Sequence, residues 1–128
     1  MQYFLTLFIL IFFQFSHANV QTEQIAPDFN LLNSYGEEVS LSEFKGQTVI
    51  LEWTNHGCPF VAKHYKTKNM QNTQVEAKKA NVVWLSIISS APGTQGFVSD
   101  REANELTKLR SAVPSHVLLD SKGLVGKS

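Results

Sequence analysis

The sequence has too few cysteines and too little excess charge for several classes of function. Its 128 residues include one cysteine, which excludes an internal disulfide framework and any zinc site built from several thiolates. Eleven Lys and Arg balance eleven Asp and Glu, so no net positive charge favours binding to nucleic acid or to an anionic membrane surface. With 43% hydrophobic and 17% charged residues, the composition is that of one small globular domain carrying a single thiol.

Residues 1–18 are interpreted as a signal peptide. No charged residue occurs in the first fifteen positions, and this apolar stretch is shorter than the ~20 residues that a transmembrane helix needs. Ser16-His17-Ala18 places small residues three and one before a cut, which is the pattern that signal peptidases read. An uncleaved anchor is the alternative, because no Lys or Arg stands near Met1. The interpretation predicts an exported protein, periplasmic or secreted, with no membrane span after cleavage.

The remaining residues, 19–128, are expected to form one α/β domain. Asp28–Leu31 and Val39–Leu41 flank turn residues and predict an N-terminal β-hairpin. Continuous apolar runs at Thr48–Trp53 and Val82–Ile88 are typical of parallel strands buried on both faces. Further helices and one more strand are expected over 41–44, 59–65, 69–79, 99–110 and 116–119. Strands that alternate with helices indicate a parallel sheet with right-handed crossovers.

Cys58 stands where such a fold places its chemistry, between the first parallel strand and the helix that follows it. Pro59 suits the first position of a helix, so Cys58 occupies or adjoins the N-cap. Unpaired N–H groups and the helix dipole stabilise an anion at this position, and a thiolate formed there is a nucleophile. We therefore interpret Cys58 as a reactive thiol, with an inert, buried cysteine as the alternative.

Histidines near this cysteine raise the question of a metal site. His56, Cys58 and His64 supply imidazole and thiolate ligands that suit copper or zinc. Their spacing matches no recognised metal-binding signature, and His56 falls in the loop before the predicted helix. We interpret these histidines as side chains that tune the thiol or take no part in its chemistry, so neither a metal nor another cofactor is expected.

Several motifs give the chain a resemblance to a known family. They are Ala26-Pro27-Asp28-Phe29, the stretches 39–46 and 49–53, and Cys58-Pro59-Phe60-Val61. Their order and spacing are similar to those of redoxin domains, the alkyl hydroperoxide reductase/thiol-specific antioxidant branch of the thioredoxin-like superfamily. The resemblance extends over residues 25–127. It implies a thioredoxin-like fold, with thiol–disulfide or peroxiredoxin-like peroxide chemistry.

The sequence departs from two patterns of that superfamily. Thioredoxin-type reductases carry Cys-x-x-Cys, whereas Val61 takes the place of the second cysteine here and excludes a dithiol cycle within the motif. Peroxiredoxins place Thr three residues before the reactive cysteine. Asn55 holds this position, and its amide can donate a hydrogen bond to a peroxide oxygen. The arginine that orients the peroxiredoxin thiolate has no evident counterpart, since Arg101 and Arg110 are the only arginines.

Glu52 lies six residues before Cys58. At this spacing, the resemblance implies a buried carboxylate that assists proton transfer during disulfide exchange. A position at the end of the strand, facing solvent, is the alternative. The predicted site therefore comprises Cys58 and Glu52, with Asn55 and His56 in the loop between them.

Together these residues predict an enzyme, an exported thiol-dependent oxidoreductase or antioxidant whose Cys58 attacks a peroxide or a disulfide. Because the sequence has no second cysteine, an external thiol reductant or a disulfide partner protein must resolve the product. The competing class is a non-enzymatic thioredoxin-like module that binds a partner protein, copper or zinc.

The resemblance also implies a later segment with a cis-proline, which is not found before Ser128. The thioredoxin-like domain is therefore expected to be truncated at its C-terminus. In that case the strand Thr48–Trp53 lacks a sheet neighbour and has an open apolar edge.

Overall fold

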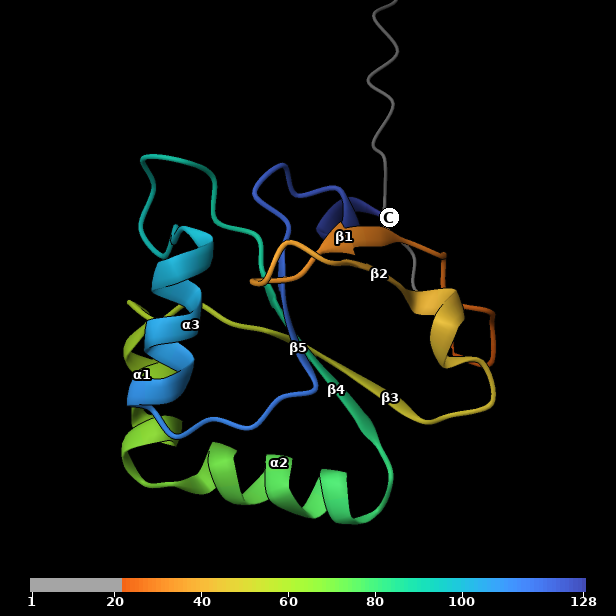
Figure 1. The fold of residues 1–128 in the computed structure, drawn as a ribbon, viewed down its shortest axis with the longest axis horizontal. Helices are drawn as coiled ribbons and strands as arrows, with labels where there is room; N and C mark the ends of the chain where they lie inside the picture. The colour runs from red at the N-terminus through yellow and green to blue at the C-terminus, as the bar shows by residue number, and fades with distance from the viewer. Residues whose placement is uncertain (1–21) are drawn as a thin grey trace, which may run out of the picture.

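The computed structural model describes residues 22–128, which build strands and helices around a three-stranded sheet (Figure 1). The predicted signal peptide, 1–18, lies outside the described residues. The predicted alternation of elements is confirmed, and the predicted boundaries agree with the structure or differ from it by one or two residues. The strands and helices are β1 (Asn30–Leu32), β2 (Glu38–Ser40), β3 (Val49–Trp53), α1 (Pro59–Lys66), α2 (Asn69–Lys79), β4 (Val83–Ile88), α3 (Asp100–Leu109) and β5 (His116–Leu119). Short 3-10 helices cover Leu41–Phe44 and Val125–Lys127.

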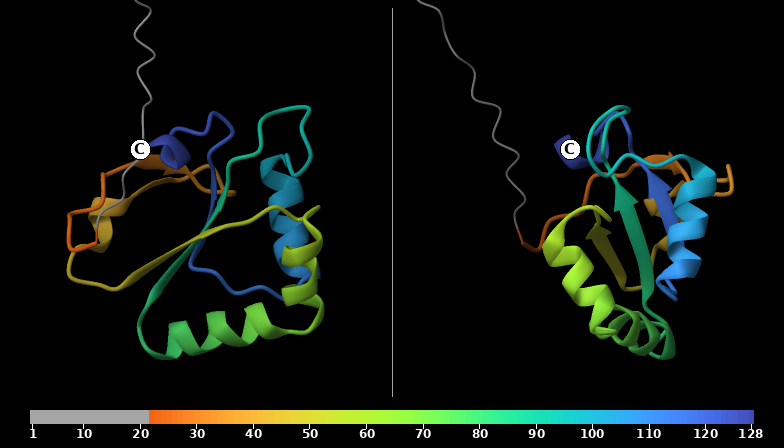
Figure 2. Two further views of the ribbon diagram at one scale, coloured as in Figure 1. Left: turned by 180° about the vertical axis from the view of Figure 1, so that it is seen from behind. Right: turned by 90° about the vertical axis from the view of Figure 1, so that its left-hand side faces the viewer.

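The main sheet has the strand order β3-β4-β5, and both neighbouring pairs are parallel. Glu52 of β3 lies opposite Ser86 of β4. Right-handed connections between parallel strands that advance in one direction place their helices on the same face of the sheet. In Figure 2 the helices accordingly gather on one side and the N-terminal hairpin on the other.

Two apolar clusters cover the two faces of the central strand, β4. Leu85 and Ile87 pack toward the hairpin, in a cluster that includes Leu31 and Val39. Ile88 packs on the other face, in a cluster with Ala103 of α3. This alternation follows the two-residue period of a strand. β4 has a neighbouring strand on each side, the hairpin on one face and α3 on the other. The prediction that this strand is buried on both faces is therefore confirmed.

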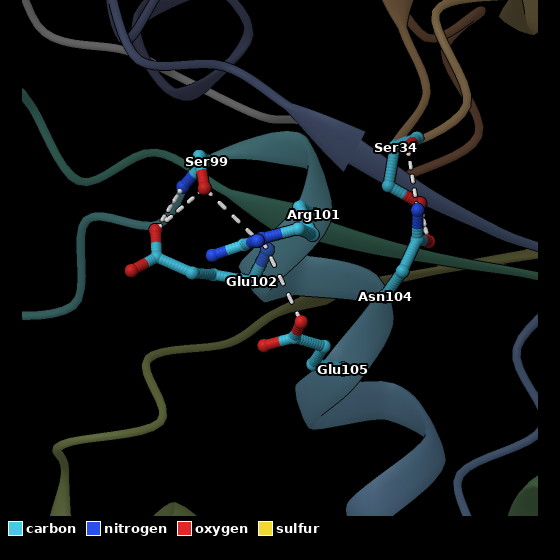
Figure 3. A network of polar contacts seen from close by, with 6 residues as sticks. All are labelled: Ser34, Ser99, Arg101, Glu102, Asn104 and Glu105. Carbon is cyan, nitrogen blue, oxygen red and sulfur yellow. Dashed lines mark hydrogen bonds and ion pairs between the residues drawn. The ribbon is translucent and has the colours of Figure 1, made fainter.

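The predicted N-terminal hairpin is confirmed as an antiparallel pair of β1 and β2. Its turn extends beyond the pair and lies along the outer edge of β5. Asn33 forms an isolated bridge with Leu118, and the Ser34 amide donates to the Val117 carbonyl at 2.9 Å. Ser34 also exchanges two hydrogen bonds with Asn104 of α3, at 2.6 and 2.7 Å (Figure 3). The turn therefore ties the hairpin to the helical face.

β3 is an edge strand in the described part of the chain, and the expectation that it is buried on both faces is wrong. Its residues are half-buried, and Trp53 is 48% exposed, because β4 is its only neighbour among residues 22–128. Thr54 N–H donates to Ile87, and the Thr48 carbonyl accepts from Val83. The backbone N–H and C=O groups of the even-numbered residues of β3 therefore form hydrogen bonds with β4. Those of the odd-numbered residues point away from β4. Within residues 22–128, no strand pairs with this edge of β3.

A break separates the two helices that follow β3, as the sequence predicts. Lys68 has a left-handed conformation, with φ at +59°. Its backbone amide donates to the Tyr65 carbonyl at 3.1 Å, which closes the last turn of α1. Both helices are short, and among the residues that the structure describes no helix is long and apolar enough to cross a membrane.

Replacement of Asn104 by alanine should lower the free energy of unfolding by about 1–3 kcal/mol, because it leaves the hydroxyl and carbonyl of the buried Ser34 without partners. Arg101→Ala on the same helix removes only an exposed ion pair, 3.6 Å from Glu105, and should change stability by less than about 0.5 kcal/mol. Chemical denaturation of the two variants measures the difference. Equal effects would show that the hairpin turn is not anchored through Asn104.

Candidate active site

Cys58 is the N-cap residue of α1, as the sequence predicts. Its backbone is extended, with φ at −77° and ψ at 125°, and Pro59 occupies the first helical position. The thiol is free and half-buried, and it makes no capping hydrogen bond. The carbonyl of Cys58 accepts the Ala62 N–H at 2.9 Å, which starts the helix. A thiolate at this place therefore faces the positive end of the helix dipole and remains open to a reactant.

Two loops brace each other beside the thiol. Asn55 accepts a hydrogen bond from Gly57 N–H at 2.8 Å, and its side-chain amide donates to the Gln95 carbonyl at 3.3 Å. The Gln95 side chain donates in return to the Gly57 carbonyl at 3.0 Å. The segment before Cys58 is thereby fixed to the loop that follows β4.

Gly96 completes this brace. Its φ of +89° is unfavourable for residues with a Cβ, and a Cβ at this position would overlap the Asn55 side chain. Asn55 therefore contributes to the position of the loop, and one of its amide hydrogens is already engaged. Its predicted role as a donor to a peroxide stays a prediction.

Glu52 points to the helical face of the sheet rather than to solvent. One carboxylate oxygen accepts hydrogen bonds from the Trp84 indole and the Ser86 hydroxyl, both at 2.7 Å. Tyr65 donates to the other oxygen at 3.3 Å, and the Gln74 amide lies 3.5 Å from the first. Four donors from α1, α2 and β4 thus converge on one carboxylate. This satisfies the rule that a charge removed from water needs hydrogen-bond partners.

The carboxylate of Glu52 and the thiol of Cys58 are not hydrogen-bonded to each other. Among residues 22–128, the partners of Glu52 are the four donors above. Tyr65 lies seven residues beyond Cys58, which is about 10 Å along a helix. No hydrogen bond between Glu52 and Cys58 therefore provides a path for direct proton transfer. The proton-transfer role of Glu52 stays a prediction.

The donors around Glu52 are not evident from the sequence. Trp84 and Ser86 are two residues apart on β4, so they share the face to which Glu52 points. Gln74 is only 1% exposed, and its carbonyl oxygen accepts the Val113 N–H at 2.8 Å. A polar side chain in the middle of a helix gave no signal by itself, because its burial depends on the strand beneath it.

Burial raises the pKa of Tyr65 to about 12, and the negative charge of Glu52 adds to this effect. The guanidinium of Arg110 lies 4.5 Å from the centre of the Tyr65 ring and acts in the opposite direction. Tyr65 therefore keeps its proton at physiological pH. It remains a donor to Glu52.

His56 is exposed in the loop before Cys58 and lies against α3. Its charge makes a minor contribution to the lowered pKa of Glu102, after the dominant hydrogen bonds from Ser99. His64 pairs with Asn69 at 3.0 Å. In the described part of the chain, no three His, Cys, Asp or Glu side chains form a group that could hold a metal ion.

Comparison with known proteins identifies a family. The model of the AhpC/TSA family matches residues 22–128, which is the whole of the described chain. A search of curated proteins finds no match.

Three solved structures resemble the protein at low sequence identity. A hypothetical protein from Sinorhizobium meliloti has a TM-score of 0.72 and 18% identity, over 85% of this chain and 58% of its own. A thiol:disulfide interchange protein from Bacteroides has a TM-score of 0.64 and 17% identity, over 84% and 67%. An exposed lipoprotein thioredoxin from Streptococcus pneumoniae has a TM-score of 0.55 and 25% identity, over 76% and 68%. The chain thus spans less than two thirds of the length of the Sinorhizobium protein.

A methyl group at Gly96 should displace the loop that carries Cys58. Gly96→Ala is expected to destabilise the protein by about 1–3 kcal/mol through overpacking. It should also slow alkylation of the thiol at neutral pH, because Cys58 leaves its N-cap position. Gly93→Ala is the matched control, since Gly93 also has a positive φ, +79°, but has nothing within 4 Å of a new Cβ. If both variants alkylate equally fast, the brace does not position the thiol.

Tyr65 should make the protein lose stability between pH 10 and 12. Below pH 10 the tyrosine is protonated in the folded and unfolded states, and its contribution is fully present. As the pH rises through this range, the unfolded chain releases the proton while the folded protein keeps it up to a pKa of about 12, so the unfolded state becomes more favourable. Tyr65→Phe should remove this decline in urea titrations, whereas Tyr35→Phe, at an exposed position, should retain it.

Proposed function

The chain belongs to the AhpC/TSA family, and from this premise we propose that it is an exported thiol–disulfide oxidoreductase whose reactive group is Cys58. The observation that carries the proposal is a free, half-buried thiol at the N-cap of α1 in a thioredoxin-like fold. Proline at the first helical position leaves no N–H there, so the nearest free amides, which belong to the next two residues, face an incoming sulfur or oxygen.

The proposed reaction is a pair of exchanges. The Cys58 thiolate attacks one sulfur of a disulfide R–S–S–R′, so that a mixed disulfide forms and R′–S⁻ leaves. An external thiolate R″–S⁻ then attacks the R sulfur of the mixed disulfide, which releases the Cys58 thiolate and R–S–S–R″. In the net reaction, R′ leaves the original disulfide as a thiolate, the external thiol takes its place in the new disulfide R–S–S–R″, and Cys58 returns to its initial state.

A disulfide fits this site better than a peroxide. Activation of a peroxide is favoured by positive or hydrogen-bonding side chains beside the thiolate, in addition to the backbone amides of the helix start. Arg101 lies 3.6 Å from Glu105, and Arg110 stacks on Tyr65, so the interactions of both arginines are with other groups. The Asn55 side chain is engaged with Gly57 and Gln95. These contacts support disulfide exchange as the activity.

We infer that Glu52 is a positioning residue in this reaction. Its carboxylate is held beneath α1 by Tyr65 and by donors of β4 and α2, without a contact to Cys58. A negative charge at this place acts on the thiol through the electrostatic field and through the position of α1. Its removal is expected to change the pH dependence of the exchange more than the maximal rate.

The proposal includes an extracytoplasmic location and a protein or small thiol as redox partner. The apolar first fifteen residues and the small residues at 16 and 18 support export. The pneumococcal relative is described as an exposed lipoprotein, which agrees with this location. Because the sequence has one cysteine, the second thiol comes from outside these 128 residues.

Mass spectrometry of the intact protein tests the function. Incubation with oxidised glutathione should add one glutathione to the wild type, and reduced glutathione should remove it. Cys58→Ser should acquire no adduct. Glu52→Gln should form the adduct with a shifted pH profile while it keeps the wild-type fold by circular dichroism.

Two results would contradict the proposal. A Cys58 thiol that does not react in the folded protein, but reacts after denaturation, would support a binding module instead. Catalytic consumption of hydrogen peroxide, through a sulfenic acid on Cys58 and without exchange with disulfides, would assign the protein to the peroxidases of the family.

A further inference from the structure

A groove runs along α3 on the helical face of the protein. Its first half lies between α3 and the loops at His56 and Phe97, and its second half lies between α3 and α1. It consists of two hollows of about 440 and 470 Å³. Both are lined by His56, Leu106 and Leu109, so the two hollows share one apolar wall on α3. We call the whole the α1–α3 groove. The right-hand view of Figure 2 shows the two helices flanking this region of the sheet.

Two large apolar side chains in the groove are exposed to solvent. Leu109 is 81% exposed and Phe97 is 39% exposed. Leu109 takes part in both hollows, and Phe97 lines one of them. Contact with another molecule would remove both from solvent. An exposed apolar group at the centre of a groove is typical of a binding anchor.

The two ends of the groove carry opposite charges. Glu102 and Glu105 line the hollow near the start of α3, and Lys66 and Lys68 line the hollow near the end of α1. The hydrogen bonds from Ser99 go to one oxygen of Glu102, and the other oxygen points away from them (Figure 3). The charge pattern fits a ligand that is positive at one end and negative at the other.

Residues on either side of Cys58 in the sequence line the groove, although Cys58 itself lines neither hollow. His56, two residues before Cys58, lines both hollows. Ala62, one helical turn after Cys58, lines one of them, and its N–H donates to the Cys58 carbonyl. A chain whose sulfur is bonded to Cys58 can therefore continue into the groove.

We propose that the α1–α3 groove binds the polypeptide segment next to the cysteine of a disulfide-bonded partner protein. This rests on the proposed function and specifies its substrate class as a protein rather than a small disulfide. The segment is extended and places one large apolar side chain on Leu106 and Leu109. A basic residue faces Glu102 and Glu105, and an acidic residue faces the lysines. The apolar contact supplies affinity, and the charges set the direction of the chain.

Rates of reaction with three disulfides test the proposal. The small probe is oxidised glutathione. The other two are glutathione mixed disulfides of peptides that contain one cysteine and a leucine flanked by lysine and aspartate, and they differ only in the order of the two charges. The wild type should react roughly fivefold faster with one charge order than with the other, and faster with both than with the small probe.

Leu109→Asn should lower the rates with both peptides by roughly fivefold, through the lost apolar contact, and leave the rate with oxidised glutathione unchanged. The double variant Lys66→Glu and Lys68→Glu should abolish the preference between the charge orders, because both ends of the groove are then acidic. Leu124→Asn is the matched control, because Leu124 is also exposed, at 62%, but lines a different hollow. It should behave as the wild type with all three disulfides.

The outcomes separate this proposal from the proposed function. If the wild type reacts with oxidised glutathione but Leu109→Asn reacts with the peptides as fast as the wild type does, the function stands and the groove is not the binding site. The same conclusion follows if Leu109→Asn slows the small probe equally, since the substitution then acts on the thiol and not on binding. If Cys58 reacts with no disulfide, the proposed function fails and the groove proposal fails with it.

Discussion

The parallel pairing of β3 with β4 is the constraint on which the site depends. It fixes Glu52 opposite Ser86, so that the carboxylate meets the Ser86 hydroxyl and the indole of Trp84. It also brings the ends of both strands to the same edge of the sheet, where the loop before Cys58 meets the loop around Gly96. A shift of the register by one residue would turn Glu52 toward the hairpin core and remove its donors.

This pairing gives Glu52, on β3, and Cys58, after the loop that follows β3, two different environments. Glu52 is surrounded by donors beneath the helices, and its charge is tied to Tyr65, whose pKa rises to about 12 mainly through burial. Cys58, one loop further on, is half-buried at a helix start and has no side-chain partner there. The fold thus keeps its carboxylate partnered and leaves its thiol accessible. This division is what a nucleophile with an external reactant requires.

The sequence predicted the elements well, because strong apolar runs and capping residues act locally. The helical break near Lys68, the N-cap position of Cys58 and the start of α3 at Ser99 are features of this kind. It could not predict contacts that depend on distant loops. One such contact is the hydrogen bond from the Asn55 amide to the carbonyl of Gln95, forty residues away. The burial of Gln74 likewise follows from the strand beneath it and not from its own helix.

In the proposed reaction, a lone thiol makes the second exchange the harder one. In a Cys-x-x-Cys motif an internal thiol attacks the mixed disulfide at high effective concentration, whereas Val61 removes that route here. Resolution by an external thiol then depends on how readily Cys58 leaves, and a leaving thiolate is favoured where its charge is stabilised. The amides and dipole at the start of α1 supply this stabilisation without a second side chain. In the proposed reaction, the helix start that stabilises the attacking thiolate would therefore also favour its release, so that one structural feature serves both exchanges.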